Sequence, residues 1–401
     1  MKNYIPCLDG IRGLLALWVF WGHLTYAVGA TIPVLSGPSM AVDLFMVLSG
    51  FLMAWHWLSA EPKKRAGGSE TRRWIEFWNR RFFRIAPLYY VLLLAALLLD
   101  ARVSAAKAAM KAIYHSAAAT LSGVAQAPVD SLQNVLAHLS FAFGLHPAYA
   151  SNDMLPDWSL SLEMQFYLAF PLLVLLCRPT RIIVFSCVSV AIAVVAKRLF
   201  GYDGLHGMLA TFPQPTLLIL KLHVFAAGMA LGWLVAVREA RHAPHFFLAL
   251  IIPLALLDRP VTLAIVGITA LLVVDSPLFV LPKRLLGSKP FRILGDLSYA
   301  VYLVHLIPSY LILDALQQRG LFSHASPYAR FGIATSTLTP VVFVIAFVLH
   351  HAVERPGILL GRHVGQKLRA RPAETDINTD ELLLQPVAVH IESPQENATN
   401  D

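Results

Sequence analysis

Charged residues are scarce in this chain: Asp, Glu, Lys and Arg make up 14% of its 401 residues, whereas 57% are hydrophobic. A soluble protein has roughly a quarter charged residues. The apolar residues occur in runs of about 17–25, which is the length that crosses ~30 Å of hydrocarbon as a helix. The composition therefore excludes an ordinary soluble enzyme and predicts an all-α protein with many transmembrane helices.

Other features are also missing. The three cysteines, Cys7, Cys177 and Cys187, have neither the spacing of metal ligands nor an obvious disulfide partner, and we expect no metal site. The sequence has no internal repeat, no glycine-rich phosphate loop and no soluble catalytic domain. The net charge of +8 does not indicate nucleic-acid binding, because the basic residues lie in loops between apolar runs. Any chemistry must then take place in the membrane bundle, in contact with membrane lipids.

Ten apolar runs predict about ten spans in a transmembrane helical bundle. These are residues 9–30, 39–59, 85–100, 158–177, 181–199, 216–237, 244–258, 261–281, 294–316 and 331–351. The loop 61–84 is rich in Lys and Arg, which is typical of the cytoplasmic side and places both termini there. We expect a transmembrane domain over residues 1–365 and a disordered polar cytoplasmic tail over 366–401.

Ionisable residues inside the predicted spans are candidate functional residues, because each costs ~2.5–3.5 kcal/mol to insert at mid-membrane. The first span carries Arg12 near one face and His23 deep inside, and the second span carries Asp43. If the two spans run antiparallel, Asp43 lies at the depth of His23 and orients its imidazole as a base. Alternatively, His23 is a packed core histidine and Asp43 is solvated at the interface.

The basic segment before the third span has a specific spacing. Arg81 and Arg84 are three residues apart, so a helix presents both guanidinium groups on one face. Guanidinium groups bind phosphate oxygens in a bidentate manner. The alternative is a positively charged anchor on the cytoplasmic side.

Two later spans contribute further candidates. Trp158 is expected at the interface, and Glu163 lies more than one turn into the fourth span, where it needs a cationic partner or a substrate hydroxyl. In the ninth span, Ser298, Tyr302 and His305 fall on one helical face. A packing role for His305 is an equal alternative.

Five segments follow one another along the chain: "LDGIRGLLALWVFWGH", "VDLFMVLSGFLM", "RRFFRIAPLYY", "WSLSLEMQFYLAFPLL" and "LGDLSYAVYLVHLIP". Together, and in this order, they resemble the membrane acyltransferases of acyltransferase family 3 over roughly residues 5–355. The resemblance implies transfer of an acyl group, usually acetyl, from cytoplasmic acyl-CoA to a hydroxyl of a glycan or glycolipid at the surface of a bacterial inner membrane. It also implies that His23 is catalytic and that Arg12, Arg81 and Arg84 are important.

The expected mechanism has Arg81, Arg84 and Arg12 on the coenzyme phosphates and His23 as general base, with Asp43 as its support and Glu163 among the catalytic residues. Donors for the oxyanion are Ser49, Tyr302 or His305, and direct transfer and an acyl-histidine relay both stay open. A proton-coupled transporter using the same His, Asp and Glu residues is the alternative function. A second enzymatic alternative is the membrane-bound O-acyltransferase family, which leaves the Arg12–His23 pair unexplained. The acceptor sugar, the acyl length and the oligomeric state are open.

Overall fold

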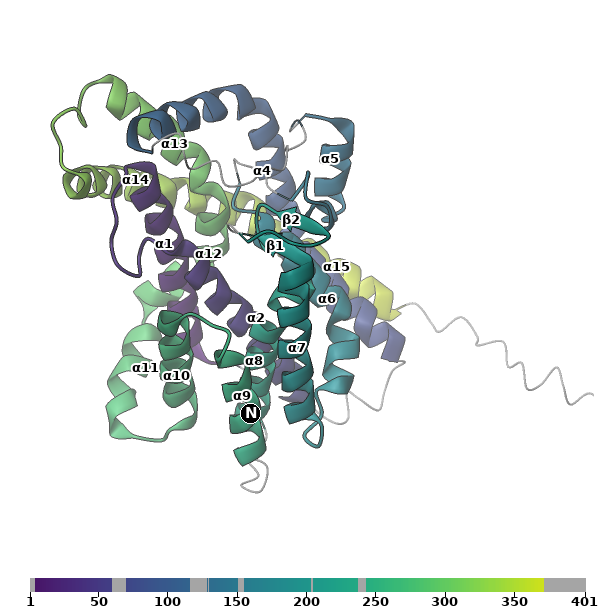
Figure 1. The fold of residues 1–401 in the computed structure, drawn as a ribbon. Helices are drawn as coiled ribbons and strands as arrows, with labels where there is room; N and C mark the ends of the chain where they lie inside the picture. Colours follow the sequence, from purple (N-terminus) through teal and green to yellow (C-terminus); the bar gives the residue numbers. More distant parts are fainter. Residues whose placement is uncertain are drawn as a thin grey trace, which may run out of the picture.

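The structure is a computed structural model that describes residues 4–59, 70–115, 128, 130–150, 155–202, 205–236 and 243–370. Helices dominate these ranges (Figure 1). The strands β1 (Phe200–Tyr202) and β2 (Ala210–Phe212) form one short parallel pair, with Gly201 opposite Thr211. The all-α expectation is confirmed for the described part of the chain.

The helices and single turns follow one another along the chain. They are α1 (Pro6–Ala27), α2 (Pro38–Ser59), α4 (Glu70–Tyr114), α5 (Leu132–Leu139), η2 (Phe143–Leu145), α6 (Trp158–Leu176), α7 (Ile182–Leu199), α8 (Leu218–Ala236), α9 (Ala243–Leu254), α10 (Arg259–Val273), η3 (Pro277–Phe279), α11 (Val280–Leu286), α12 (Lys289–Val304), α13 (Leu306–Gln318), α14 (Pro327–Leu349), the π-helical turn η4 (His350–Glu354) and α15 (Arg355–Ala370).

The number of spans differs from the sequence expectation. Among the described residues, six helices are long and apolar enough to cross a membrane, or up to eight if each of two bent helix pairs is one span. The predicted span 261–281 corresponds to α10 and the helices after it, which bend by 111°, and the predicted span 244–258 contains the 12-residue helix α9. Ten spans and the cytoplasmic termini stay predictions, and the expected tail lies outside the described residues from 371 onward.

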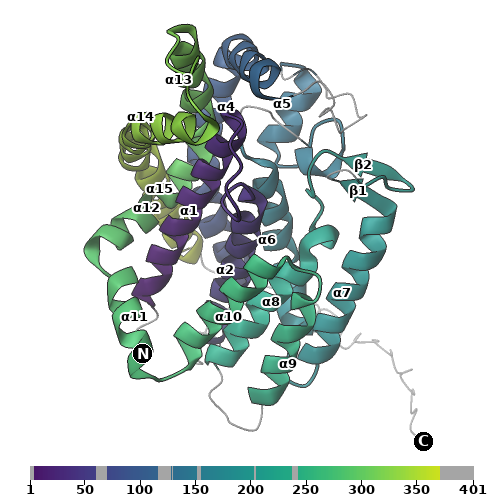
Figure 2. The ribbon, with the colours of Figure 1, turned by 60° about the vertical axis from the view of Figure 1, so that its left-hand side comes forward.

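Two helix pairs approach closely because glycines face the partner backbone. A Cβ on Gly50 of α2 would lie 2.3 Å from the carbonyl oxygen of Phe225, and a Cβ on Gly295 of α12 would lie 2.3 Å from that of Asp9. Small residues allow such contact between membrane helices. Consequently α2 lies against α8, and α1 lies against α12 (Figure 2).

The predicted span 294–316 is broken at His305. Helices α12 and α13 meet there at 66°. Pro308 explains the break, because it has no N–H to bond the carbonyl of Val304 and its ring crowds that carbonyl. The bend brings His305 into the bundle, where it is completely buried.

Candidate active site

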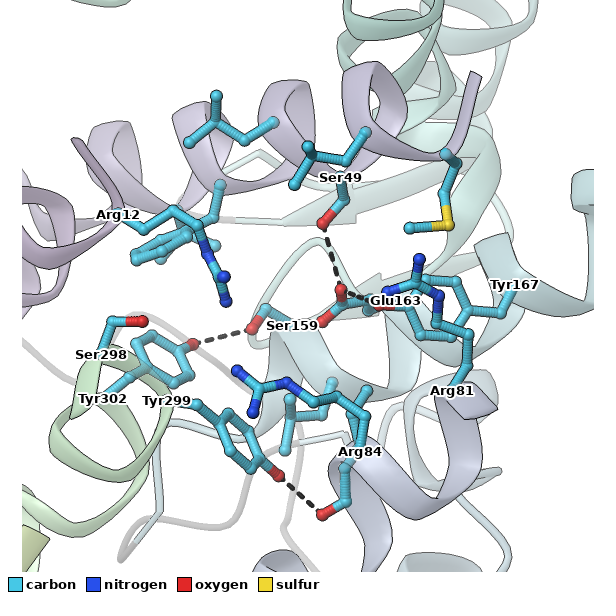
Figure 3. Close-up of a pocket in the computed structure, with 17 residues that line it drawn as sticks. Arg12, Ser49, Arg81, Arg84, Ser159, Glu163, Tyr167, Ser298, Tyr299 and Tyr302 are labelled. Carbon is cyan, nitrogen blue, oxygen red and sulfur yellow. Dashed lines mark hydrogen bonds between the residues drawn. The ribbon is translucent and has the colours of Figure 1, made fainter. Parts of the chain in front are cut away.

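A cavity of about 140 Å³ lies between α1, α2, α4, α6 and α12 (Figure 3). Its polar lining residues are Arg12, Ser49, Arg81, Arg84, Ser159, Glu163, Tyr167, Ser298, Tyr299 and Tyr302. Seven of the residues predicted from the sequence therefore meet in one place. They come from five helices that are far apart in the chain.

The three predicted arginines have different surroundings. Arg12 points into the cavity and has no hydrogen bond or ion pair with another described residue (Figure 3). Arg81 lies over the rings of Phe77 and Tyr167, with its guanidinium carbon 5.6 Å from the Tyr167 centroid. Arg84 forms an ion pair with the buried carboxylate of Glu354. Arg12 thus offers an unneutralised cation to an anionic ligand.

Glu163 accepts two hydrogen bonds from hydroxyl groups on its Oε1 atom. One comes from Ser49 Oγ at 3.1 Å and the other from the hydroxyl of Tyr167, one turn further along α6. These bonds connect α2 to α6 at the cavity wall. They also use the hydroxyl proton of Ser49, so this serine does not serve as the oxyanion donor that we expected.

The hydroxyl proton of Tyr302 is likewise already used in a hydrogen bond within the protein. Its hydroxyl donates to the carbonyl of Pro156 at 2.6 Å, so the 2.7 Å contact with Ser159 is a bond donated by the serine. Ser298, by contrast, is 1% exposed and its hydroxyl has no hydrogen-bond partner within the described ranges. Of the predicted hydroxyl groups, Ser298 alone keeps a proton for a substrate oxygen.

The two predicted membrane histidines pair with each other. His23 Nδ1 lies 3.1 Å from His305 Nε2 and 2.9 Å from the carbonyl oxygen of Val19. A carbonyl only accepts, so we assign the His23 proton to Nδ1 and the lone pair to Nε2. His305 Nδ1 is assigned its proton in the same way, through the carbonyl of Val301 at 3.2 Å. This tautomer is the one in which His23 acts as a base.

The histidine pair does not line the cavity; it lies directly beyond it. The ring of Tyr302, which forms part of the wall, is 6.5 Å from the ring of His305 between centroids. Trp158 also lies outside the lining, although its neighbour Ser159 is part of it.

The predicted bond between Asp43 and His23 is wrong. Both carboxylate oxygens of Asp43 accept from Lys221 Nζ of α8, at 2.7 and 2.9 Å. Asp43 is 6% exposed, and a buried carboxylate needs a charged partner. The close packing of α2 on α8 supplies Lys221, a cation within an apolar run that the sequence analysis did not weigh.

Sequence reasoning also missed several residues of the site. Tyr299 directly follows Ser298 and donates to the carbonyl of Ile85 at 2.8 Å. Glu354 holds Arg84 from outside the cavity, and it follows the last predicted span, residues 331–351. Tyr299 lies within one of the quoted family motifs, whereas Glu354 lies in none of them. Within the described part of the chain, no group of three His, Cys, Asp or Glu side chains is placed to hold a metal ion.

A second polar cluster surrounds Asp157, which directly precedes α6 and lies outside the spans. Burial raises the pKa of Asp157 to about 8. Tyr89 donates to Asp157 Oδ2 at 3.1 Å, and His138 Nε2 lies 3.6 Å from the same oxygen. Because Asp157 adjoins the Pro156 carbonyl that holds Tyr302, this cluster fixes one end of the cavity.

Comparison with known proteins identifies the class. The profile of the acyltransferase domain called acyltransferase family 3 matches residues 5–350. The chain therefore belongs to this family, and with its long apolar helices it is an integral membrane protein.

Three relatives illustrate the similarity. Acyltransferase MdmB of Streptomyces mycarofaciens is 32% identical over 48% of this chain and 45% of its own. The peptidoglycan O-acetyltransferase OatA of Listeria monocytogenes is 28% identical over 42% of this chain and 24% of its own. The exopolysaccharide production protein ExoZ of Rhizobium meliloti is 28% identical over 83% of this chain and 94% of its own. The chain thus spans less than half the length of the first two. No solved structure matches it.

Proposed function

We propose that this protein is a membrane O-acyltransferase that moves an acetyl group from acetyl-CoA to a sugar hydroxyl of a cell-surface polysaccharide, lipopolysaccharide or glycolipid. The observation that supports this most is the cavity lined by three arginines, with the His23–His305 pair next to its wall residue Tyr302. The part of the cavity beside Arg12 and Arg84 is called its arginine end. Cationic groups suit the phosphates of the coenzyme, and a neutral imidazole suits a hydroxyl that must lose its proton.

The acyl donor is proposed to enter from the arginine end. Arg12, Arg81 and Arg84 bind its phosphate oxygens, and the thin pantetheine arm carries the thioester along the cavity towards Tyr302. The hydroxyl of Ser298 lies on this path without another partner. It donates to the thioester carbonyl oxygen as negative charge develops there.

His23 is proposed as the general base. Its Nε2 takes the proton from the acceptor hydroxyl while the hydroxyl oxygen bonds to the carbonyl carbon. The carbon–sulfur bond then breaks, and the coenzyme thiolate recovers the proton from the imidazolium. His305 supports the ring through the 3.1 Å contact in place of the predicted Asp43.

The relatives guide the choice of acceptor. One is named a peptidoglycan O-acetyltransferase and another an exopolysaccharide production protein, which supports a glycan acceptor here. We propose the bacterial inner membrane as the location, with the arginine end of the bundle in the cytoplasm, in agreement with the basic loop 61–84.

The test is acetyl transfer by the purified protein in lipid nanodiscs, followed by coenzyme release and by mass spectrometry of the glycan acceptor. His23→Ala should lower the transfer rate by about 10²–10⁴-fold, because a positioned base is lost. His56→Ala is the matched control, since His56 Nδ1 makes the same one-turn contact, 2.7 Å from the carbonyl of Leu52, at an exposed position. Full activity of the His23 variant would refute the proposed mechanism.

A further inference from the structure

A second, larger cavity of about 590 Å³ adjoins the arginine end of the first one. It lies between α1, α4, α12 and the continuous helix formed by α14, η4 and α15. Arg12 and Arg84 line both cavities, so the two cavities meet at these side chains. Its size falls in the usual range of ligand pockets.

The walls of this second cavity are basic. Arg355 and Arg362 of α15 are seven residues apart, which is close to two helical turns, and both line it. Both are exposed, and neither has a hydrogen bond or ion pair with another described residue. The carboxylate of Asp296 also lines the cavity, against the four arginines. The cavity thus has an excess of positive charge.

Part of the wall is aromatic and apolar. The rings of Phe347 and His351 lie 4.2 Å apart between centroids, and Ile293 and Leu359 face the same space. Aromatic faces next to arginines are the usual surface for a stacked nucleobase. Charge and aromatic surface together indicate a nucleotide.

Helix α15 is firmly held beside the basic end of α4. A Cβ on Gly357 would lie 2.6 Å from Pro87 Cγ, and one on Gly361 would lie 2.5 Å from Phe83 Cβ. Asn79 Nδ2 donates to the Gly361 carbonyl at 2.7 Å. Arg355 and Arg362 therefore project from a docked helix.

The π-helical turn η4 contributes His350 and His351 to the second cavity. Its buried Glu354 accepts from His350 at 2.9 Å and pairs with Arg84, so one carboxylate positions a guanidinium that lines both cavities. π-Turns inside long helices occur frequently at functional sites.

We propose that the second cavity binds the nucleotide end of the acyl donor, the 3′-phosphorylated adenosine diphosphate part, with Arg355 and Arg362 on its phosphates. This inference rests on the proposed function and extends it to α15. The diphosphate group also reaches Arg12 and Arg84, which line both cavities, and the pantetheine arm passes between them into the first cavity. Neither arginine of α15 takes part in the transfer itself.

The experiment compares two acyl donors. In nanodiscs, the variant Arg355→Gln/Arg362→Gln should raise the KM for acetyl-CoA by about ten-fold with kcat unchanged, because two charge-assisted bonds are lost. Its KM for S-acetylpantetheine, which has no phosphate, should equal that of the unsubstituted protein. Adenosine 3′,5′-bisphosphate should inhibit the unsubstituted protein with acetyl-CoA and inhibit the variant less.

The control variant is Arg178→Gln/Arg181→Gln, which removes two exposed arginines from the loop between α6 and α7 and should change neither KM. An unchanged KM for acetyl-CoA in the α15 variant would overturn the inference and leave the proposed function intact. An equal loss with both acyl donors would assign Arg355 and Arg362 to anchoring α15 on lipid headgroups. If the unsubstituted protein transfers no acetyl group from acetyl-CoA, the proposed function itself is wrong.

Discussion

The ion pair between Asp43 and Lys221 gives a quantitative prediction. Lys221 Nζ donates to both oxygens of Asp43, and the two side chains are 11% and 8% exposed. The variant Asp43→Asn keeps the shape of the side chain but leaves the ammonium group without a carboxylate inside the bundle. Removing one partner of a buried pair costs about 3–5 kcal/mol, and replacing both partners by groups of similar volume is often neutral.

We therefore expect Asp43→Asn to destabilise the protein by about 3–5 kcal/mol and Asp43→Asn/Lys221→Met to recover most of that loss. Stability is measured by denaturant unfolding in detergent, and acetyl transfer is measured on the same samples. If the pair only joins α2 to α8, the double variant also recovers activity. A double variant that is stable but inactive would show that Asp43 acts on the chemistry and would refute the structural role.

Two further predictions concern the histidine pair and the buried acid. His305→Phe removes the 3.1 Å contact that holds His23. In steady-state kinetics, kcat should therefore fall by roughly ten-fold while the KM for acetyl-CoA stays constant. A change in KM alone would instead place His305 in acyl-donor binding. The raised pKa of Asp157 means that the folded protein holds a proton that the unfolded chain releases above its ordinary pKa near 3.8, so stability should decline as the pH rises towards about 8. Asp157→Asn should flatten this decline in unfolding midpoints, and equal slopes for both proteins would contradict the assignment.

Much of the helical architecture could be predicted from the sequence, because membrane-spanning helices are recognised by the length and hydropathy of their apolar runs. The face of α12 with Ser298, Tyr302 and His305 was predicted from spacing alone, and the structure places Ser298 and Tyr302 in the cavity wall. Arg12 and Glu163 were found because ionisable groups inside apolar runs are costly. Such residues can be predicted because the free-energy cost of burying an ionisable group follows from the apolar sequence on either side of it.

The partners of these residues could not be predicted, because they depend on which helices touch. Lys221 was hidden in an apolar run, and only the packing of α2 on α8 brings it to Asp43. Pro308 was visible in the sequence, but its effect at His305 depends on a bend of 66°. The segment after Glu354 lies beyond the last predicted span, and only the structure shows that its glycines dock it on α4.

The π-helical turn η4 has a consequence for how α15 tolerates change. Such a turn contains one residue more than the α-helical stretch it replaces, and each residue of an α-helix advances the facing direction by ~100°. The wider winding of the turn absorbs this extra residue, so the regular helix on either side of it keeps the same angular register. Loss of a single residue here, such as Ala352, would restore regular winding and still leave Gly357 and Gly361 facing Pro87 and Phe83. A deletion within α15 between these two glycines has no such turn to absorb it and would move Gly361 away from Phe83.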